Sequence, residues 1–376
     1  MELGFTEEQD MLRQSAREFL AEQSPKTLVR EMEEDPVGFR PDMWKKMADL
    51  GWMGLVIPEE YGGSGNGFMD LFVLLEETGR ACLVAPFFST ALCTYFLLDI
   101  ASEKQKKELL PAIARGDVVL ALALTEPSAS YEAAGVETRA TALNDTYIIN
   151  GTKLFINDGQ VARYLICVAR TDDSAPPDRA VTAFLVDAKS PGITISPLES
   201  IADDKQTEIV FDNVSVPKEN ILGRLNEGWP AIERLIERAA VAKCAEMIGG
   251  ADWTVENSIA YAKERVQYGK PIGSFQAIQH YLAEMWAEFG HAKRLVYYAA
   301  SLLDAGIPCT REVAMAKAQM SEVYTLRTHF GVRIHGGIGT TRDHDMGLYY
   351  RRARQAACSF GDAEFWREKV AASLAL

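Results

Sequence analysis

Apolar residues recur at helical spacing through the first third of the chain. Thr6 precedes the first such segment and is followed by acidic residues, a combination that favours the start of a helix. Further helices are predicted over 44–52, 69–82 and 89–100 and from Ser102 onward. The pattern therefore predicts an N-terminal helical domain over residues 1–117.

The spacing changes near residue 118, where short apolar runs and alternating positions replace the helical pattern. Such runs predict β-strands. Asn150-Gly151 is a dipeptide typical of tight turns, so residues 147–154 are expected to form a hairpin. Other strands are expected at 118–124, 164–169, 181–186, 193–195 and 208–211. Together these segments predict a middle β domain over residues 118–225.

From residue 226 the chain returns to helical spacing and is rich in Ala, Glu, Arg and Leu. Consecutive long helices joined by short connections predict an antiparallel four-helix bundle over residues 226–376. The predicted helices lie near 230–266, 275–304, 310–333 and 345–374. The predicted fold class is α+β and mostly α, with a helical domain, a β domain and a helical bundle in that order.

The connection between the first two helices of this bundle carries the most distinctive residues. Tyr268-Gly269-Lys270-Pro271 breaks the helical pattern, and Ser274 is expected to cap the next helix. Arg265 then lies at the end of one helix, and Gln276 at the start of the next. A guanidinium group beside helix-opening N–H groups suits a phosphate-bearing ligand. On the residues alone, an ordinary connection with a solvated Arg265 is equally compatible with this pattern.

The acidic balance of the chain restricts its partners. Its formal net charge of −14 argues against binding to nucleic acid or to an anionic membrane surface. Six cysteines lie apart without a CxxC pair, which indicates reduced thiols, and His344 has no second ligand cluster, so no metal site is expected. The first ten residues are polar and acidic, unlike a signal peptide, and no apolar run approaches membrane-spanning length. We expect a cytoplasmic protein without membrane insertion.

Residues 265–279 follow the pattern R-x-Q-[YF]-G-x-P-I-G-x-F-Q-x-x-Q, which resembles the signature loop of the acyl-CoA dehydrogenase family. The run LGWMGLVIPEEYGGSGNG at residues 50–67 resembles another part of the same family, and the resemblance extends over essentially the whole chain. It implies FAD as cofactor, α,β-desaturation of an acyl-CoA substrate and electron transfer to an electron-transferring flavoprotein. A homotetramer or heterotetramer is implied as well, because the family's loop binds the FAD of a neighbouring subunit.

The resemblance also implies which residues contact the cofactor. In the family, a Thr-Glu-Pro segment and an aromatic residue on a second strand contact the flavin, and a glycine turn receives the pyrophosphate. On the residues alone, Gly336-Gly337 equally predicts an ordinary helix end. The matching residues are Leu124, Thr125, Phe155, Asn157, Arg265, Gln267, Tyr268, Phe275, Gln276, Arg333, Gly336 and Gly337.

This chain departs from the family at three of its motifs. Ser130-Tyr131-Glu132 replaces the usual Gly-Ser-Asp segment that contacts the flavin phosphate and the acyl chain. Asn157 replaces a Thr or Ser, and an amide can also donate a hydrogen bond near the flavin. Arg333 replaces a Gln and would still suit a phosphate.

The family's catalytic base is a glutamate, and both of its usual positions lack an acid here. One position, aligned through Arg352, falls on Gly361, and the other falls on Ala239. Asp362, one residue further along, and Glu246, two helical turns beyond Ala239, are therefore the candidate bases. Each is also compatible with an ordinary surface or helix-end carboxylate.

The missing glutamate leaves two alternatives to a self-sufficient acyl-CoA dehydrogenase. The first is a non-catalytic subunit that supports a catalytic partner in a mixed tetramer. The second, weaker alternative is a flavin monooxygenase on the same scaffold, which would not need the glutamate.

Overall fold

The computed structural model describes residues 4–375, which divide into two compact units. The helical unit comprises the described residues up to 30, residues 67–83 and residues from 239 onward. The sheet unit comprises residues 31–66 and 84–238. Two helices, α2 (Lys26–Glu34) and α7 (Trp229–Glu264), have residues in both units.

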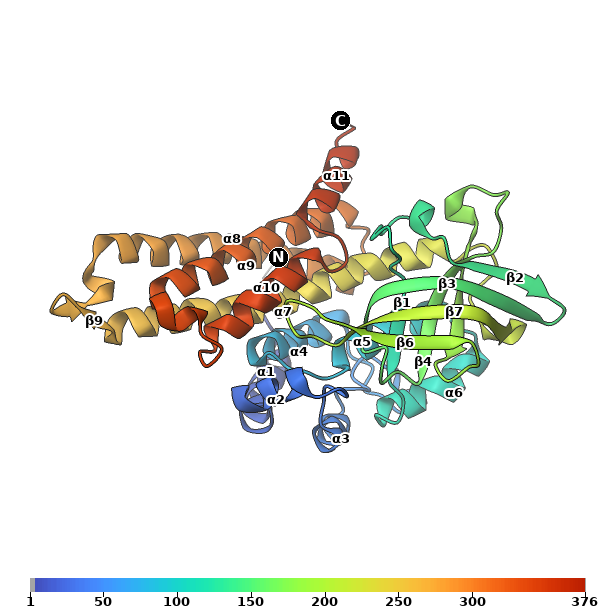
Figure 1. The fold of residues 1–376 in the computed structure, drawn as a ribbon, viewed down its shortest axis with the longest axis horizontal. Coiled ribbons are helices and arrows are strands. Elements are labelled where there is room, and N and C mark those ends of the chain that lie inside the picture. The colour runs from blue at the N-terminus through green and yellow to red at the C-terminus, as the bar shows by residue number, and fades with distance from the viewer. Residues whose placement is uncertain (1–3, 376) are drawn as a thin grey trace. The chain divides into compact units, whose positions relative to one another are not determined.

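Long helices build the helical unit (Figure 1). Besides α7 they are α1 (Glu7–Gln23), α4 (Phe68–Ala81), α8 (Gln276–Asp304), α9 (Thr310–His335), α10 (Met346–Cys358) and α11 (Ala363–Ser373). α8 and α9 run side by side, α10 and α11 pack against α9, and α1 packs against α4. The predicted helix cap at Thr6 is confirmed: Gln9 N–H donates to Thr6 Oγ1 at 3.2 Å, and Thr6 N–H donates to Gln9 Oε1 at 3.2 Å.

The prediction of one continuous helix over 345–374 is wrong, because the chain breaks between α10 and α11. Phe360 and Gly361 adopt φ angles of 55° and 92°, which no right-handed helix can contain. Asp362 then caps α11, since its carboxylate accepts the N–H of Phe365 at 2.8 Å. The glycine and the aspartate thus act as a stop signal and a start signal.

The connection between α7 and α8 is a small hairpin. β9 (Val266–Gln267) pairs with β10 (Lys270–Pro271) in antiparallel orientation. Tyr268 and Gly269 have φ angles of 53° and 77°, as in a two-residue turn that matches the twist of its strands. The predicted cap at Ser274 is wrong: its hydroxyl donates to Pro271 O at 2.7 Å within a short 3₁₀ turn, and α8 starts after Phe275 without a side-chain cap.

A mixed β-sheet forms the centre of the sheet unit (Figure 1). Its strands are β1 (Leu120–Ala123), β2 (Arg139–Leu143), β3 (Thr146–Asn157), β4 (Tyr164–Arg170), β5 (Val181–Asp187), β6 (Ile193–Leu198), β7 (Gln206–Pro217) and β8 (Ile221–Leu222). They follow the order β6-β7-β3-β2-β4-β5-β8, with β1 paired to β4 in parallel. The α-helices that lie wholly within this unit are α3 (Pro41–Asp49), α5 (Phe87–Ile100) and α6 (Glu103–Ala114). Buried apolar residues such as Ile149, Phe184 and Phe211 form the core of the sheet.

The predicted hairpin at Asn150-Gly151 is wrong, because β3 runs straight through this dipeptide. The turn lies earlier, at Asn144-Asp145, between β3 and the unpredicted strand β2. Gly151 instead marks a register shift in the pairing of β3 with β7. A Cβ atom at this position would lie 2.5 Å from Oγ1 of Thr138, so the glycine permits a close approach of chains rather than a turn.

Candidate functional site

The predicted cofactor residues fall into two groups, one in each unit. Leu124, Thr125, Phe155 and Asn157 belong to the sheet unit, and all the others belong to the helical unit.

In the sheet unit, the end of β1 and the second half of β3 lie beside each other. Leu154 N–H donates to Thr125 O at 2.9 Å, which ties the two segments together. Leu124 and Thr125 are buried and Asn157 is half-buried, whereas Phe155 is 51% exposed. Phe155 also has a φ angle of 59°, an uncommon conformation for a bulky side chain. The backbone therefore presents an aromatic ring at the surface, where the family resemblance implies contact with a flavin.

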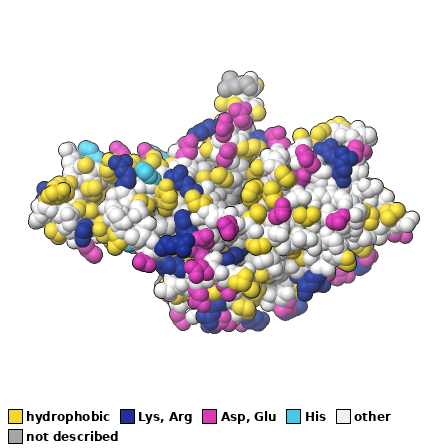
Figure 2. All heavy atoms as spheres, viewed as in Figure 1, with side chains coloured by type: hydrophobic (Ala, Val, Ile, Leu, Met, Phe, Trp, Pro, Cys, Tyr) yellow, Lys and Arg dark blue, Asp and Glu magenta, His cyan; other side chains and the backbone are white. Residues whose placement is uncertain are grey.

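In the helical unit, the hairpin of β9 and β10 carries exposed polar and aromatic groups. Arg265 and Gln267 are exposed, and Tyr268 at the tip is 93% exposed. Figure 2 shows hydrophobic side chains on the surface at the end of the helical unit where β9 lies. The ring of Phe275 meets the Tyr268 ring edge-on, with centroids 6.1 Å apart, and lies under the ammonium group of Lys270 at 4.4 Å.

The glycine turn at the end of α9 leaves open space. Gly336 has a φ angle of 67°, and a Cβ atom added at Gly336 or Gly337 would meet no atom within 4 Å. Arg333, on the last turn of α9, is exposed and donates from Nη2 to the Tyr281 hydroxyl at 3.1 Å. Free glycine backbone beside an exposed guanidinium group is an arrangement that can accept phosphate oxygens.

An apolar cluster holds the hairpin and the glycine turn at the same end of the helical unit. Val255, Met285 and Ile334, from α7, α8 and α9, form its buried centre. Ile272, directly after the hairpin, packs against them, and its N–H donates to Arg265 O at 2.8 Å. The structure therefore places Arg265 and Gly336, which lie far apart in the sequence, at the same end of the helical unit.

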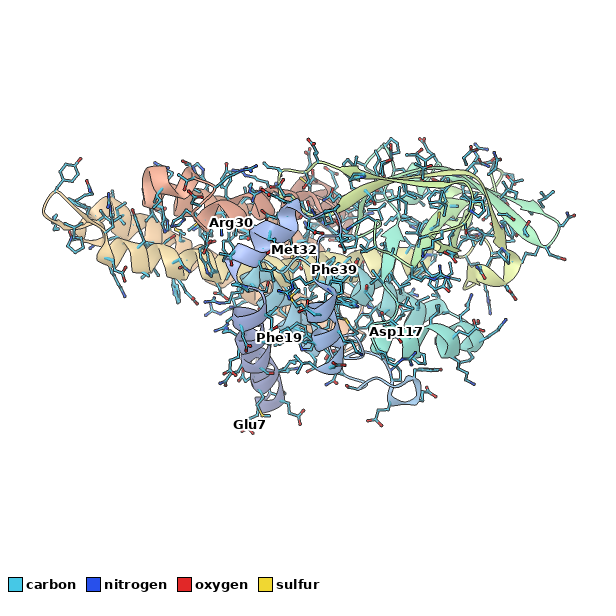
Figure 3. The ribbon with its side chains drawn as sticks, turned by 60° about the horizontal axis from the view of Figure 1, so that its bottom comes forward. Glu7, Phe19, Arg30, Met32, Phe39 and Asp117 are labelled. Carbon is cyan, nitrogen blue, oxygen red and sulfur yellow. The ribbon has the colours of Figure 1, made fainter. Side chains whose placement is uncertain are left out.

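His335, directly before the glycine turn, is buried and stacked on Tyr261 with ring centroids 4.3 Å apart. Its Nδ1 lies 2.8 Å from Gly331 O. Burial, with a smaller contribution from the neighbouring His344, holds the pKa of His335 below its usual value of 6.5. The next loop is held by Arg30 of α2, labelled in Figure 3, which donates to Asp343 O and Asp345 Oδ1.

The lowered pKa of His335 predicts a loss of stability in acid. The unfolded chain takes up a proton at His335 near pH 6.5, whereas the folded chain does so only at lower pH. The free energy of unfolding should be insensitive to His335 above pH 6.5 and should fall below it, by up to about 1.4 kcal/mol per pH unit. Urea unfolding from pH 5 to 8, compared with His335→Gln, measures this. Equal pH slopes for both proteins would contradict the prediction.

The two candidate bases differ in their surroundings. Asp362 is exposed and caps α11. Glu246 on α7 is partly buried, with 25% of its side chain exposed, and its Oε2 accepts from Lys243 Nζ at 2.5 Å. The turn before Asp362 is fixed by the buried Lys317, whose Nζ donates to Gly361 O at 2.9 Å and whose pKa is lowered by burial to about 8.

At Gly361, one usual position of the family's glutamate, a side chain would require a local change. A Cβ atom at Gly361 would lie 2.4 Å from the Phe365 ring and 2.8 Å from Trp366 Nε1. Ala239, at the other position, is completely buried. The absence of the glutamate at Gly361 is therefore matched by the packing around that position.

Comparison with known proteins decides the family. Three family models match in chain order: "Acyl-CoA dehydrogenase, N-terminal domain" at residues 6–117, the middle domain at 121–214 and the C-terminal domain at 226–375. The chain belongs to the acyl-CoA dehydrogenase family. Members of this family are FAD-dependent oxidoreductases that act on CH–CH groups.

Individual members of the acyl-CoA dehydrogenase family align over nearly the whole chain. Acryloyl-CoA reductase (NADH) from Anaerotignum propionicum is 34% identical over 99% of this chain and 95% of its own length. The caffeyl-CoA reductase-Etf complex subunit CarC from Acetobacterium woodii is 35% identical over 93% of each chain. The solved structure of butyryl-CoA dehydrogenase from Megasphaera elsdenii superposes with a TM-score of 0.93 at 28% identity and covers 100% of both chains.

Sequence reasoning missed two charged residues beneath the two segments of the sheet unit that are expected to contact the flavin. Lys153 and Glu126 are both buried and form an ion pair. A signal was available for the lysine, because it continues the inward alternation of Tyr147 and Ile149 along β3.

Among the helices of residues 4–375, none has the length and apolar character needed to cross a membrane.

Proposed function

We propose that this chain is an FAD-dependent acyl-CoA dehydrogenase that introduces a double bond between the α and β carbons of a CoA thioester and passes the electrons to an electron-transferring flavoprotein. The observation that carries the proposal is the end of the helical unit where Arg265, Tyr268 and the Gly336–Gly337 turn lie together. The names of two relatives support it, since one acts on acryloyl-CoA and the other belongs to a caffeyl-CoA reductase–Etf complex.

The residues predicted to contact the cofactor have side chains and backbone that suit the parts of FAD. Arg265 and the open backbone of Gly336 and Gly337 suit its pyrophosphate, and the exposed Tyr268 offers a ring for its adenosine end. In the sheet unit, the exposed Phe155 would pack against the flavin ring. Bound FAD supplies an acceptor for the hydride that leaves the β carbon.

The chain's own residues would bind the cofactor, orient the substrate and move one proton. A carboxylate, of Asp362 or of Glu246, takes the proton from the α carbon of the thioester. Asn157 offers its half-buried side-chain amide as a hydrogen-bond donor beside Phe155. Phe155 excludes water from the ring that it covers.

A visible spectrum of the purified protein tests this proposal. The protein should be yellow, and anaerobic addition of its acyl-CoA substrate should bleach the flavin absorbance. A panel of saturated thioesters differing in chain length and branching identifies the substrate. The same experiment should test the reverse reaction, because relatives are named as reductases. In that reaction, photoreduced protein is mixed with enoyl-CoA thioesters, and the return of the flavin absorbance is measured. A colourless protein that takes up no added FAD would rule the proposal out.

A second candidate function is a non-catalytic subunit of a heteromeric acyl-CoA dehydrogenase. The packing at Gly361 favours it, because a side chain there would meet Phe365 and Trp366, and Ala239 at the other position carries no acid. Co-expression with a homologue that carries this glutamate tests the alternative. Bleaching by the mixed complex, with none by this chain alone, would select the second candidate.

Oligomer state and cofactor binding should be linked. If Arg265 and its hairpin bind the FAD of a neighbouring subunit, a homotetramer or heterotetramer holds the cofactor and a monomer does not. Diluting the protein from micromolar to nanomolar concentration should release FAD, seen as a rise in flavin fluorescence, as the mass measured by light scattering or mass photometry falls. A monomer that retains its full complement of FAD would contradict the shared site.

A further inference from the structure

A buried ion pair lies directly under the two flavin-contacting segments of the sheet unit. Lys153 Nζ is 2.6 Å from Glu126 Oε1, and the side chains are 0% and 3% exposed. Lys153 Nζ also donates to Leu124 O at 3.1 Å. The carboxylate of Glu126 accepts the N–H groups of Glu137 and Thr138, at 2.8 Å and 3.1 Å.

Each partner of this pair is close in sequence to a proposed flavin contact. Glu126 directly follows Leu124 and Thr125, and Lys153 precedes Phe155 by two residues. Because both side chains are buried and bonded to protein atoms, they are placed to support these contacts rather than to touch a ligand.

The sheet itself does not hold β3 at this point. Lys153 pairs with Ile209 of β7 and Ile156 pairs with Thr207, but the register shifts between them, at Leu154 and Phe155. At the shift, β3 is bonded to the end of β1 instead, through Leu154 N–H to Thr125 O and through the ion pair. A bulge of this kind re-aims a side chain and leaves the extra residue without a ladder partner, so here the contacts to Glu126 and Thr125 take the place of the ladder.

Burial of a charged pair adds little net stability to a fold, because both groups lose their hydration. Removing an ammonium and a carboxylate from water carries a desolvation penalty for each group, and apolar residues of similar volume often stabilise as well or better. Unlike an apolar contact, the ion pair makes directional hydrogen bonds. These bonds fix the positions of Leu124 O and of the N–H groups of Glu137 and Thr138.

We propose that Lys153 and Glu126 are positioning residues that fix Leu124–Thr125 and Phe155–Asn157 relative to each other for flavin binding. The inference rests on the proposed binding of FAD. The pair makes the bulge rigid before FAD arrives, so that FAD does not bear the cost of ordering Phe155.

The test compares four variants of the 376-residue chain with wild type. Lys153→Met removes the ammonium group, Glu126→Gln keeps the shape and the acceptor oxygen, and the double variant leaves a neutral site. Gln105→Leu is the matched control: Gln105 is buried in the same unit and donates to Glu219 O and Ile221 O at 3.0 Å, away from the flavin segments. Thermal midpoints, FAD affinity of the apoprotein and the shape of the bound-flavin spectrum are measured for each.

The dissociation constant for FAD should rise by roughly tenfold or more in Lys153→Met, as when an outer hydrogen-bond partner of a ligand is removed. The double variant should regain thermal stability relative to Lys153→Met without regaining FAD affinity. Gln105→Leu should lose thermal stability with unchanged affinity and spectrum. Amide hydrogen exchange without FAD should be faster at Leu154 in Lys153→Met and at Glu137 and Thr138 in Glu126→Gln.

Wild-type FAD affinity, spectrum and amide exchange in the pair variants would overturn the inference while leaving the proposed function intact. If neither the wild type nor any variant binds FAD, the proposed function is ruled out, and the inference is ruled out with it. If Lys153→Met does not fold, Glu126→Gln decides alone: weakened FAD binding supports the inference, and wild-type binding overturns it.

Discussion

Replacing the catalytic carboxylate should slow bleaching of the flavin by an acyl-CoA substrate by about 10²–10⁴-fold, the usual contribution of a general base. The variants are Asp362→Asn and Glu246→Gln, and only one of them should show this loss. Both substitutions are conservative. Asn caps a helix as well as Asp, so Asp362→Asn preserves the start of α11. Glu246→Gln keeps an acceptor for Lys243.

Rapid mixing under anaerobic conditions measures the bleaching rate, and FAD content is checked in every variant. Asp362→Ala is the control for the helix cap, because it should lower the thermal midpoint where Asp362→Asn does not. A loss of rate shared by Asp362→Asn and Asp362→Ala, with the thermal midpoint changed only in the latter, assigns the base to Asp362. Full activity in Asp362→Asn and in Glu246→Gln would eliminate both candidates.

Arg265→Ala should weaken FAD binding by about 1.5–3 kcal/mol, which corresponds to roughly 10- to 150-fold in the dissociation constant. The exposed guanidinium group at the hairpin suits a bidentate contact with a phosphate. Arg265→Lys should fall between wild type and Arg265→Ala, because it keeps the charge but not the fork of donors. Fluorescence titration of the apoprotein with FAD measures all three.

Arg311→Ala is the matched control, because Arg311 is an exposed arginine of the same unit that pairs with Glu312 at 3.0 Å. It should bind FAD as wild type does. Equal affinities for Arg265→Ala and Arg311→Ala would remove Arg265 from the cofactor site and leave the Gly336–Gly337 turn without its proposed partner.

Local signals in the sequence predicted much of the fold. Thr6 caps α1 as predicted, and the long helices α8 and α9 lie close to their predicted ranges. These features depend on residues within one or two turns of each other, so the signal and the structure that it specifies are close along the chain. The family pattern also identified the loop that carries Arg265, which the structure shows to contain a small hairpin.

The errors arose where one local signal has two structural meanings. Asn150-Gly151 is typical of a turn, but Gly151 is a point of close approach to Thr138 on a continuous strand. The Phe360-Gly361-Asp362 segment ends one helix and begins another, although the apolar spacing on either side suggested a single helix. At Gly151 the close approach of Thr138 decided between the two meanings, and at Gly361 the cap by Asp362 and the hydrogen bond from Lys317 hold the break between α10 and α11.

The sequence by itself determined the order of the helical and β domains and the family, because periodicity, capping residues and motifs are properties of neighbouring residues. Only the tertiary structure decided that Arg265 and Gly336 share one end of the helical unit, and that Lys153 pairs with Glu126. It also showed that Phe155 leaves the ladder of β7 at a bulge. The physical reason is the same for each: burial and hydrogen bonding between residues far apart in the chain depend on how whole elements pack.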